Sequence, residues 1–215
     1  MIYADYNRSA PLCSAVKDYL KSRIEDGPFA NPNAIHHLGA KTLMGMENAR
    51  AVCAKGLGAD YHQIIFNSGA TEGISTVFHS VLLSAKSQGK NVIITSGIEH
   101  SAVVNNAKFY ETQGYEHLSL PANHDGIIEI ETLKQWADTY RGKIALIAIM
   151  AANNETGVIQ PYEKVVELAQ KENIPFLCDT TQFIGKTPFH FKDSNVDFAV
   201  CSGHKLGALT GTGIL

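Results

Sequence analysis

The sequence predicts an α/β fold in which a mostly parallel sheet carries helices on both faces. Short apolar runs alternate with amphipathic segments over most of the 215 residues. The apolar runs contain few polar positions, which is typical of parallel strands that are covered on both sides. Hydrophobic residues make up 45% of the chain, which is enough to fill the core of one large domain.

Two helices are predicted before the first strand. The start signal Ser9-Ala10-Pro11 precedes apolar residues at helical spacing, and Gly27-Pro28 is expected to end that helix. Residues 29–38 are rich in Asn, Pro and His and predict a loop. A second helix is predicted over residues 39–55, where glycines follow as stop signals.

Strands and helices then alternate to the end of the chain. Apolar runs predict the strands, and apolar residues recurring every three or four positions predict the helices. The predicted strands are 64–66, 92–94, 115–120, 144–150, 176–178 and 198–201. The predicted helices between them are 71–85, 101–112, 130–140 and 162–172. Residues 210–215 resemble a turn and the start of another strand, so we expect an unpaired sheet edge and a truncated chain.

Composition argues against several classes of function. The 18 basic and 21 acidic residues give a net charge of −3, which favours neither nucleic acid nor an anionic membrane as a partner. No apolar run approaches the roughly 20 residues of a membrane helix, and the N-terminus has no secretory pattern. The four cysteines lack CxxC or zinc spacing, so we expect a cytoplasmic protein without a metal site.

Polar clusters follow five of the predicted strands. They comprise residues 67–71, 96–100, 153–155, 179–182 and 202–205. In open α/β sheets, ligands bind at the carboxyl ends of the strands. Five polar clusters at that edge predict one shared site rather than five unrelated loops.

Lys205 is the centre of the predicted site. It ends the turn Ser202-Gly203-His204-Lys205 after an apolar run, where its neutral amine can form a Schiff base with a carbonyl. Taken alone, it also fits an ordinary surface lysine. Asp179 ends another apolar run, and a carboxylate buried there needs a cationic partner such as a protonated ring nitrogen.

Two helix starts add further candidates. Gly69-Ala70-Thr71 offers the free N–H groups that bind a phosphate, although an N-cap with Glu72 in the first turn explains it equally well. Ser202 and His204 can donate to the same phosphate. His100 can stack on an aromatic cofactor and carry protons, or simply cap a surface helix.

The candidates together suit one cofactor class. Asn154 is a neutral donor for a phenolic oxygen, and Gln182 lies three residues after Asp179. A lysine, an acidic partner for a ring nitrogen and a phosphate site are what pyridoxal 5′-phosphate (PLP) requires. The sequence has no GxGxxG motif after a strand, which argues against a dinucleotide site.

At these residues the sequence resembles the class V aminotransferase-like PLP enzymes, and most closely the cysteine desulfurases of the NifS/IscS type. The resemblance covers essentially the whole chain. Its motifs are Tyr3-Ala4-Asp5-Tyr6-Asn7, Gly69-Ala70-Thr71-Glu72, Glu99-His100, Asn153-Asn154-Glu155-Thr156-Gly157, Asp179-Thr180-Thr181-Gln182 and Ser202-Gly203-His204-Lys205.

The resemblance implies a PLP-transferase-like large domain of fold type I for residues 1–215, with residues 1–15 as an N-terminal segment and no C-terminal small domain. It implies conversion of L-cysteine, or a similar amino acid, to L-alanine, with the sulfur passed to a persulfide. A homodimer, a sulfur-acceptor protein and a role in iron–sulfur cluster assembly are implied as well. The implied catalytic residues are Lys205 and His100. The implied cofactor-binding residues are Ala70, Thr71, His100, Asn154, Asp179, Gln182, Ser202, His204 and Lys205.

The sequence departs from the family pattern at two places. Residues 7–11 lack the usual Thr-Thr before proline, and residues 206–210 replace the more usual Gly-Pro-Lys run. None of the four cysteines lies at the persulfide position, and family members are much longer. Two alternatives therefore stay open: another class V enzyme such as a selenocysteine lyase, or a non-catalytic, truncated PLP-binding remnant.

Overall fold

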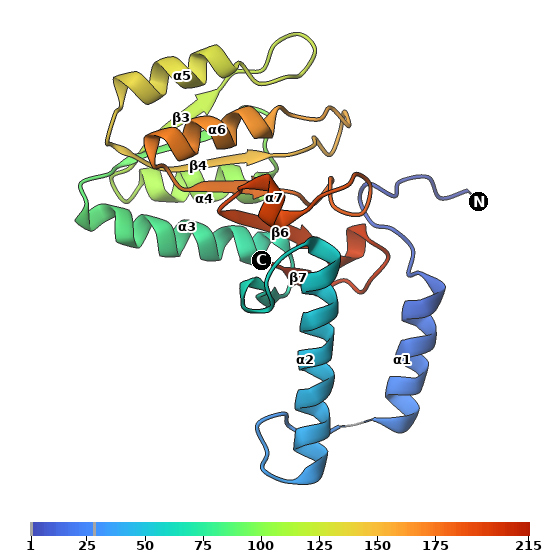
Figure 1. The fold of residues 1–215 in the computed structure, drawn as a ribbon. Helices are drawn as coiled ribbons and strands as arrows, with labels where there is room; N and C mark the ends of the chain where they lie inside the picture. Colours follow the sequence, from blue (N-terminus) through green and yellow to red (C-terminus); the bar gives the residue numbers. More distant parts are fainter. Residues whose placement is uncertain (1, 28) are drawn as a thin grey trace.

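A seven-stranded sheet runs through the centre of the computed structural model, which describes residues 2–27 and 29–215 (Figure 1). Met1 and Pro28, the residue expected to end the first helix, lie outside the described residues. The strands are β1 (Phe66–Asn67), β2 (Val92–Ser96), β3 (Glu116–Leu120), β4 (Ile144–Met150), β5 (Phe176–Asp179), β6 (Phe198–Ser202) and β7 (Gly213–Ile214). Their order across the sheet is β1-β7-β6-β5-β4-β2-β3.

The sheet is mostly parallel, as predicted. Strands β3, β2, β4, β5 and β6 pair in parallel, and β7 is antiparallel to both of its neighbours, β1 and β6. The expectation of an unpaired edge at residues 210–215 is therefore wrong. Ile65 and Leu215 extend the β1–β7 pairing, because each backbone N–H donates to the other residue's carbonyl, at 2.7 and 2.9 Å.

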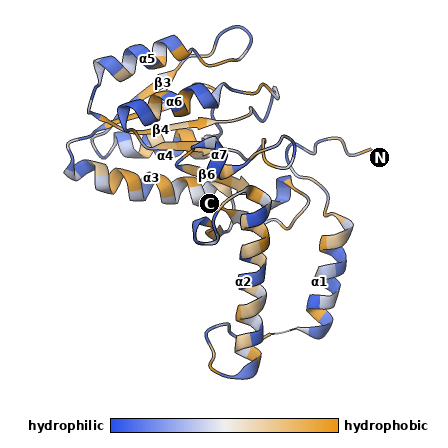
Figure 2. Cartoon of the chain, viewed as in Figure 1, coloured by the Kyte–Doolittle hydropathy of each residue, from blue (hydrophilic) through white to orange (hydrophobic). Residues whose placement is uncertain are grey.

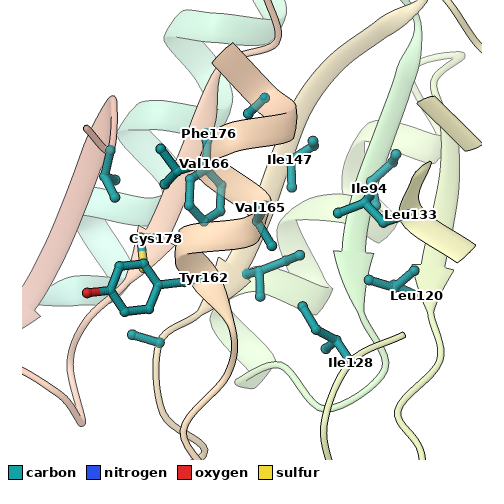
Figure 3. Packing of buried hydrophobic residues seen from close by; sticks show 14 of the residues in the cluster. Ile94, Leu120, Ile128, Leu133, Ile147, Tyr162, Val165, Val166, Phe176 and Cys178 are labelled. Carbon is teal, nitrogen blue, oxygen red and sulfur yellow. The ribbon is translucent and has the colours of Figure 1, made fainter. Parts of the chain in front are cut away.

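Helices cover both faces of the sheet. On one face lie α3 (Ala70–Ser87) and α4 (Ser101–Glu111), and on the other lie α5 (Ile130–Thr139) and α6 (Tyr162–Glu172). Successive residues of a strand point to opposite faces, so Ile93 packs towards α3 and α4 while Ile94 packs towards α5 and α6 (Figure 3). The apolar strands stand out in orange in Figure 2, between helices with mixed surfaces. The predicted helices on both faces are thus confirmed.

The two N-terminal helices lie apart from the sheet (Figure 1). They are α1 (Ser14–Asp26) and α2 (His37–Leu57). The predicted helix start at Ser9-Ala10-Pro11 is wrong. The backbone N–H groups of Ala10 and Cys13 instead donate to the carbonyls of His204 and Gly207, at 2.8 and 2.9 Å. These tertiary hydrogen bonds hold residues 10–13 outside the helix and against the loop that carries the candidate lysine.

The remaining elements are short. The 3₁₀ turns η1 (Tyr61–Gln63) and η2 (Gly203–Lys205) and the helix α7 (Phe191–Ser194) were not predicted. The predicted strand at residues 64–66 begins two residues later, because Ile64 still closes the turn of η1 with an N–H bond to the Tyr61 carbonyl. No helix in the described part of the chain is long and apolar enough to cross a membrane.

Gly213 is expected to be essential for stability, because β7 lies directly against the loop before α3. A Cβ atom at Gly213 would lie 2.4 Å from Asn67 Oδ1 and 2.5 Å from Gly69 Cα. We expect Gly213→Ala to lower the free energy of unfolding by ~1–3 kcal/mol, the usual cost of overpacking. Gly45→Ala is the control, since nothing lies within 4 Å of that position in α2 and alanine favours a helix. Urea denaturation measures both; equal stability of the two variants would contradict this account of the contact.

Candidate active site

A cavity of about 770 Å³ opens at the carboxyl ends of the parallel strands. Its volume lies within the roughly 300–1,000 Å³ of small-molecule sites. The chain runs from β2 outward to β3 and then returns across β2 to β4, so the cavity lies where the strand order reverses, the usual place for a ligand. The nine residues predicted from the sequence all line it: Ala70, Thr71, His100, Asn154, Asp179, Gln182, Ser202, His204 and Lys205.

Lys205 ends η2 directly after β6. Its amine donates hydrogen bonds to the backbone carbonyls of Asn7 and Arg8, at 2.6 and 2.8 Å. Burial lowers the pKa of the Lys205 ammonium and outweighs the carboxylates of Asp5 and Asp179, which act in the opposite direction. A lowered pKa raises the fraction of neutral amine, the form that attacks a carbonyl carbon.

Asp179 is the last residue of β5 and is only 6% exposed. The backbone N–H of Thr181 donates to its Oδ1 atom at 3.0 Å. Burial raises the pKa of the Asp179 carboxyl group, while the hydrogen bonds of Thr181 and the charges of His100 and Lys205 partly offset that rise. The amine and the carboxylate thus lie on one cavity and on the same edge of the sheet, and each alters the pKa of the other.

The N-terminus of α3 forms the third part of the cavity wall. Gly69 precedes the helix with a φ of 150°, in the range that favours glycine. The Ala70 N–H donates to Ser202 Oγ at 2.8 Å, which joins this helix to the end of β6. Glu72 accepts from the Ser68 N–H at 2.8 Å. The capping interpretation is therefore correct for Glu72, while Ala70 and Thr71 line the cavity, where the helix N-terminus favours an anion.

The other predicted side chains reach the cavity from three further loops. His100 caps α4, because its Nδ1 atom accepts from the Ala102 N–H at 3.1 Å; in the neutral ring the proton then belongs on Nε2. The Asn154 side-chain amide donates to Glu155 Oε1 at 2.7 Å. The Gln182 side-chain amide donates to the Asn7 carbonyl at 2.8 Å.

Several cavity residues were not predicted. Asn7 and Arg8 come from the N-terminal segment, and they contact Lys205 through backbone carbonyls, which every residue type has and which therefore leave no signal in a sequence. Asn153 belongs to a predicted cluster, but its side chain holds the surrounding loops together through hydrogen bonds to their backbone. Its Oδ1 atom accepts from the N–H groups of Glu155 and Thr156, at 2.9 Å each. Its Nδ2 atom donates to the Ile98 carbonyl at 3.0 Å.

Glu99 is another cavity residue that has no assigned role. Glu99 stands directly before His100 and after an apolar run, which predicts a loop at this position. The pattern does not indicate how deeply the side chain is buried. The sequence gives no sign that this carboxyl group points back under the ends of the strands.

The cavity carries groups that suit an anion, a cationic nitrogen and a carbonyl. The helix N-terminus, Ser202 and His204 suit the anion, the buried Asp179 carboxylate suits the cation, and the Lys205 amine suits a carbonyl. These are the donor and acceptor groups that PLP requires, so the residues present fit the cofactor predicted from the sequence.

Comparison with known proteins points to the same chemistry. The family model described as aminotransferase class-V matches residues 2–215. The chain is 36% identical over 214 residues to a cysteine desulfurase IscS of Dictyoglomus turgidum, covering 100% of this chain and 53% of that protein. A cysteine desulfurase IscS of Rickettsia prowazekii is 36% identical over 217 residues, and the match covers 51% of its length.

Solved structures with the same fold include two that are more than 30% identical to this chain. A NifS-like protein superposes with a TM-score of 0.94 at 33% identity, over 99% of this chain and 57% of that one. A structure described as SspA in complex with cysteine gives a TM-score of 0.91 at 32% identity, over 100% of this chain and 60% of that one. The chain thus spans about half the length of the curated relatives that it matches.

Proposed function

The chain belongs to the aminotransferase class-V family, whose members use PLP, and from this premise we propose that it is the cofactor-binding part of a cysteine desulfurase-like enzyme. The proposed reaction converts L-cysteine to L-alanine and passes the sulfur to a persulfide. The observation that carries the proposal is the meeting of the Lys205 amine, the Asp179 carboxylate and the N-terminus of α3 on one cavity.

Each cavity residue has a proposed task. Lys205 supplies the amine that attaches the cofactor, and Asp179 pairs with its ring nitrogen. Thr71, Ser202 and His204, with Ala70 beside them at the N-terminus of α3, would hold the phosphate. His100 would pack on the ring and could move a proton at its Nε2 atom, and the amides of Asn154 and Gln182 would serve as donors for the ring oxygen. When bound, the cofactor supplies an electron sink for a carbanion.

The substrate, partners and compartment are part of the same proposal. Cysteine is supported as the substrate by the names of the relatives and by the neighbour described in complex with cysteine. We propose a homodimer that hands sulfur to an acceptor protein for iron–sulfur cluster assembly, with residues 1–215 as the large domain. A cytoplasmic location is supported by the cysteines Cys13, Cys53, Cys178 and Cys201, which are all free.

The proposal is tested first by cofactor binding. We expect the purified chain to bind PLP in equilibrium dialysis with about one molecule per chain, since one cavity gathers all the proposed contacts. The bound fraction should then be incubated with L-cysteine, and alanine and sulfide measured. Absence of PLP binding at millimolar concentration would contradict the proposal.

The same experiment separates the alternatives. Binding followed by faster alanine release from selenocysteine than from cysteine would favour a selenocysteine lyase. Binding without alanine release from either amino acid would favour a non-catalytic PLP-binding protein.

A further inference from the structure

Glu99 is a buried carboxyl group on the cavity that the proposed function leaves without a task. It follows β2 and reaches the end of β4. Its Oε1 atom accepts from the Ser96 hydroxyl group and from the Met150 N–H, the latter at 3.0 Å. Its Oε2 atom is buried and has no hydrogen-bond partner among the described residues. An ionised carboxylate with a bare, buried oxygen is costly, whereas a protonated one is tolerated.

A second buried carboxyl group lies beside it. Met150, which binds Glu99, is paired in the sheet with Asp179, and both carboxyl groups line the same cavity. Two carboxyl groups that share a buried site do not both ionise readily, because each charge disfavours the other. At neutral pH, one of the two is therefore expected to keep a proton.

The surroundings decide which one keeps it. Lys205 is a cationic neighbour of Asp179 and favours its ionised form, and His100 does the same when its ring is protonated. Among the described residues, the charged group that shifts the pKa of Glu99 is Asp179, and its negative charge opposes a second ionisation. Two thiols near the pair, those of Cys178 and Cys201, have pKa values that burial raises above the usual value, so they stay neutral.

We propose that Glu99 is a positioning residue that stays protonated at neutral pH and thereby makes Asp179 the charged member of the pair. The pKa of the Glu99 carboxyl group is raised to about 8: burial is the main cause, the Asp179 charge adds to it, and the hydrogen bonds from Ser96 and Met150 oppose it. The protonation of Glu99 is a property of the cofactor-free protein and does not depend on the proposed function. Its consequence, a carboxylate at Asp179 ready for a ring nitrogen, rests on the proposed function.

Carbon-13 NMR of the cofactor-free chain, labelled at the glutamate side-chain carboxyl carbon, tests the position of the proton. We expect one resonance to titrate near pH 8, to vanish in Glu99→Gln and to persist in Glu167→Gln, a control on the exposed face of α6. In Asp179→Asn the same resonance should titrate at lower pH, because the neighbouring charge is gone. Titration of every glutamate near pH 4–5, or an unchanged midpoint in Asp179→Asn, would overturn the proposal.

Stability gives an independent measurement. Between the pKa of an unfolded glutamate and about 8, the folded chain binds a proton that the unfolded chain lacks. The free energy of unfolding should therefore fall as pH rises through this window, and the fall should be smaller in Glu99→Gln than in the wild type. Equal slopes in the two proteins would contradict a buried proton on Glu99.

Cofactor binding separates this inference from the proposed function. Glu99→Gln imitates the protonated acid, so its dissociation constant for PLP should stay within about threefold of wild type, less than ~1 kcal/mol. If Glu99 carries the charge instead, Glu99→Gln should weaken binding at least as much as Asp179→Asn does. Failure of the wild type to bind PLP would overturn the proposed function but leave the NMR result intact.

Discussion

Replacing Lys205 by alanine is expected to abolish covalent attachment of PLP. Lys205 is the lysine that lines the cavity, and burial lowers the pKa of its ammonium group towards the neutral, reactive form. After incubation with PLP and reduction with sodium borohydride, mass spectrometry should show one added cofactor on wild-type Lys205. No adduct should form in Lys205→Ala, because alanine has no amine to attach the cofactor.

Lys186→Ala is the matched control for this experiment. Lys186 lies close enough to Lys205 for its pKa to be lowered by that neighbour, after the larger effect of burial, and it donates to the side chain of Gln182. It is outside the lining of the cavity. We therefore expect Lys186→Ala to keep the adduct on Lys205. An undiminished adduct in Lys205→Ala, or its loss only in Lys186→Ala, would remove Lys205 from its proposed task.

The fold was largely predictable because each strand and helix carries its own local pattern. The run Ile144–Met150 is buried along its whole length, and from Leu146 to Ile149 its residues alternate between the two helical layers. By contrast, the first helix begins later than its sequence suggests. Hydrogen bonds from Ala10 and Cys13 to a loop nearly 200 residues away override the local start signal. A pattern within a short window contains no information about such partners.

The residues of the site, too, are predictable where they have a local pattern and unpredictable where they depend on distant partners. Asp179 and Lys205 are predictable because Asp179 ends an apolar strand and Lys205 ends the turn after another, and parallel strands bring their carboxyl ends to one edge. The carbonyls of Asn7 and Arg8 were missed because backbone groups have no residue signature. Glu99 was missed because its importance depends on burial and on an unpartnered oxygen, which are properties of packing.

Asp179→Asn is expected to weaken PLP binding by about two to four orders of magnitude. Removing one partner of a buried ion pair, such as that between a carboxylate and a ring nitrogen, typically costs ~3–5 kcal/mol. Each ~1.4 kcal/mol corresponds to a factor of ten in the dissociation constant. Asparagine keeps the shape of the side chain and its acceptor oxygen for the Thr181 N–H. The change therefore removes the charge with little disturbance of the end of β5.

Asp197→Asn separates this loss of charge from a general effect on β5. The Asp197 carboxylate accepts from the Phe176 N–H at 2.9 Å, at the start of the same strand, and it lies outside the lining of the proposed cofactor cavity. Asp197→Asn should lower stability through a weaker hydrogen bond yet leave the dissociation constant for PLP within about threefold of wild type, less than ~1 kcal/mol. Equilibrium dialysis measures both variants under one set of conditions. If the two weaken binding equally, the loss reflects damage to the strand, and Asp179 has no special relation to the ring nitrogen.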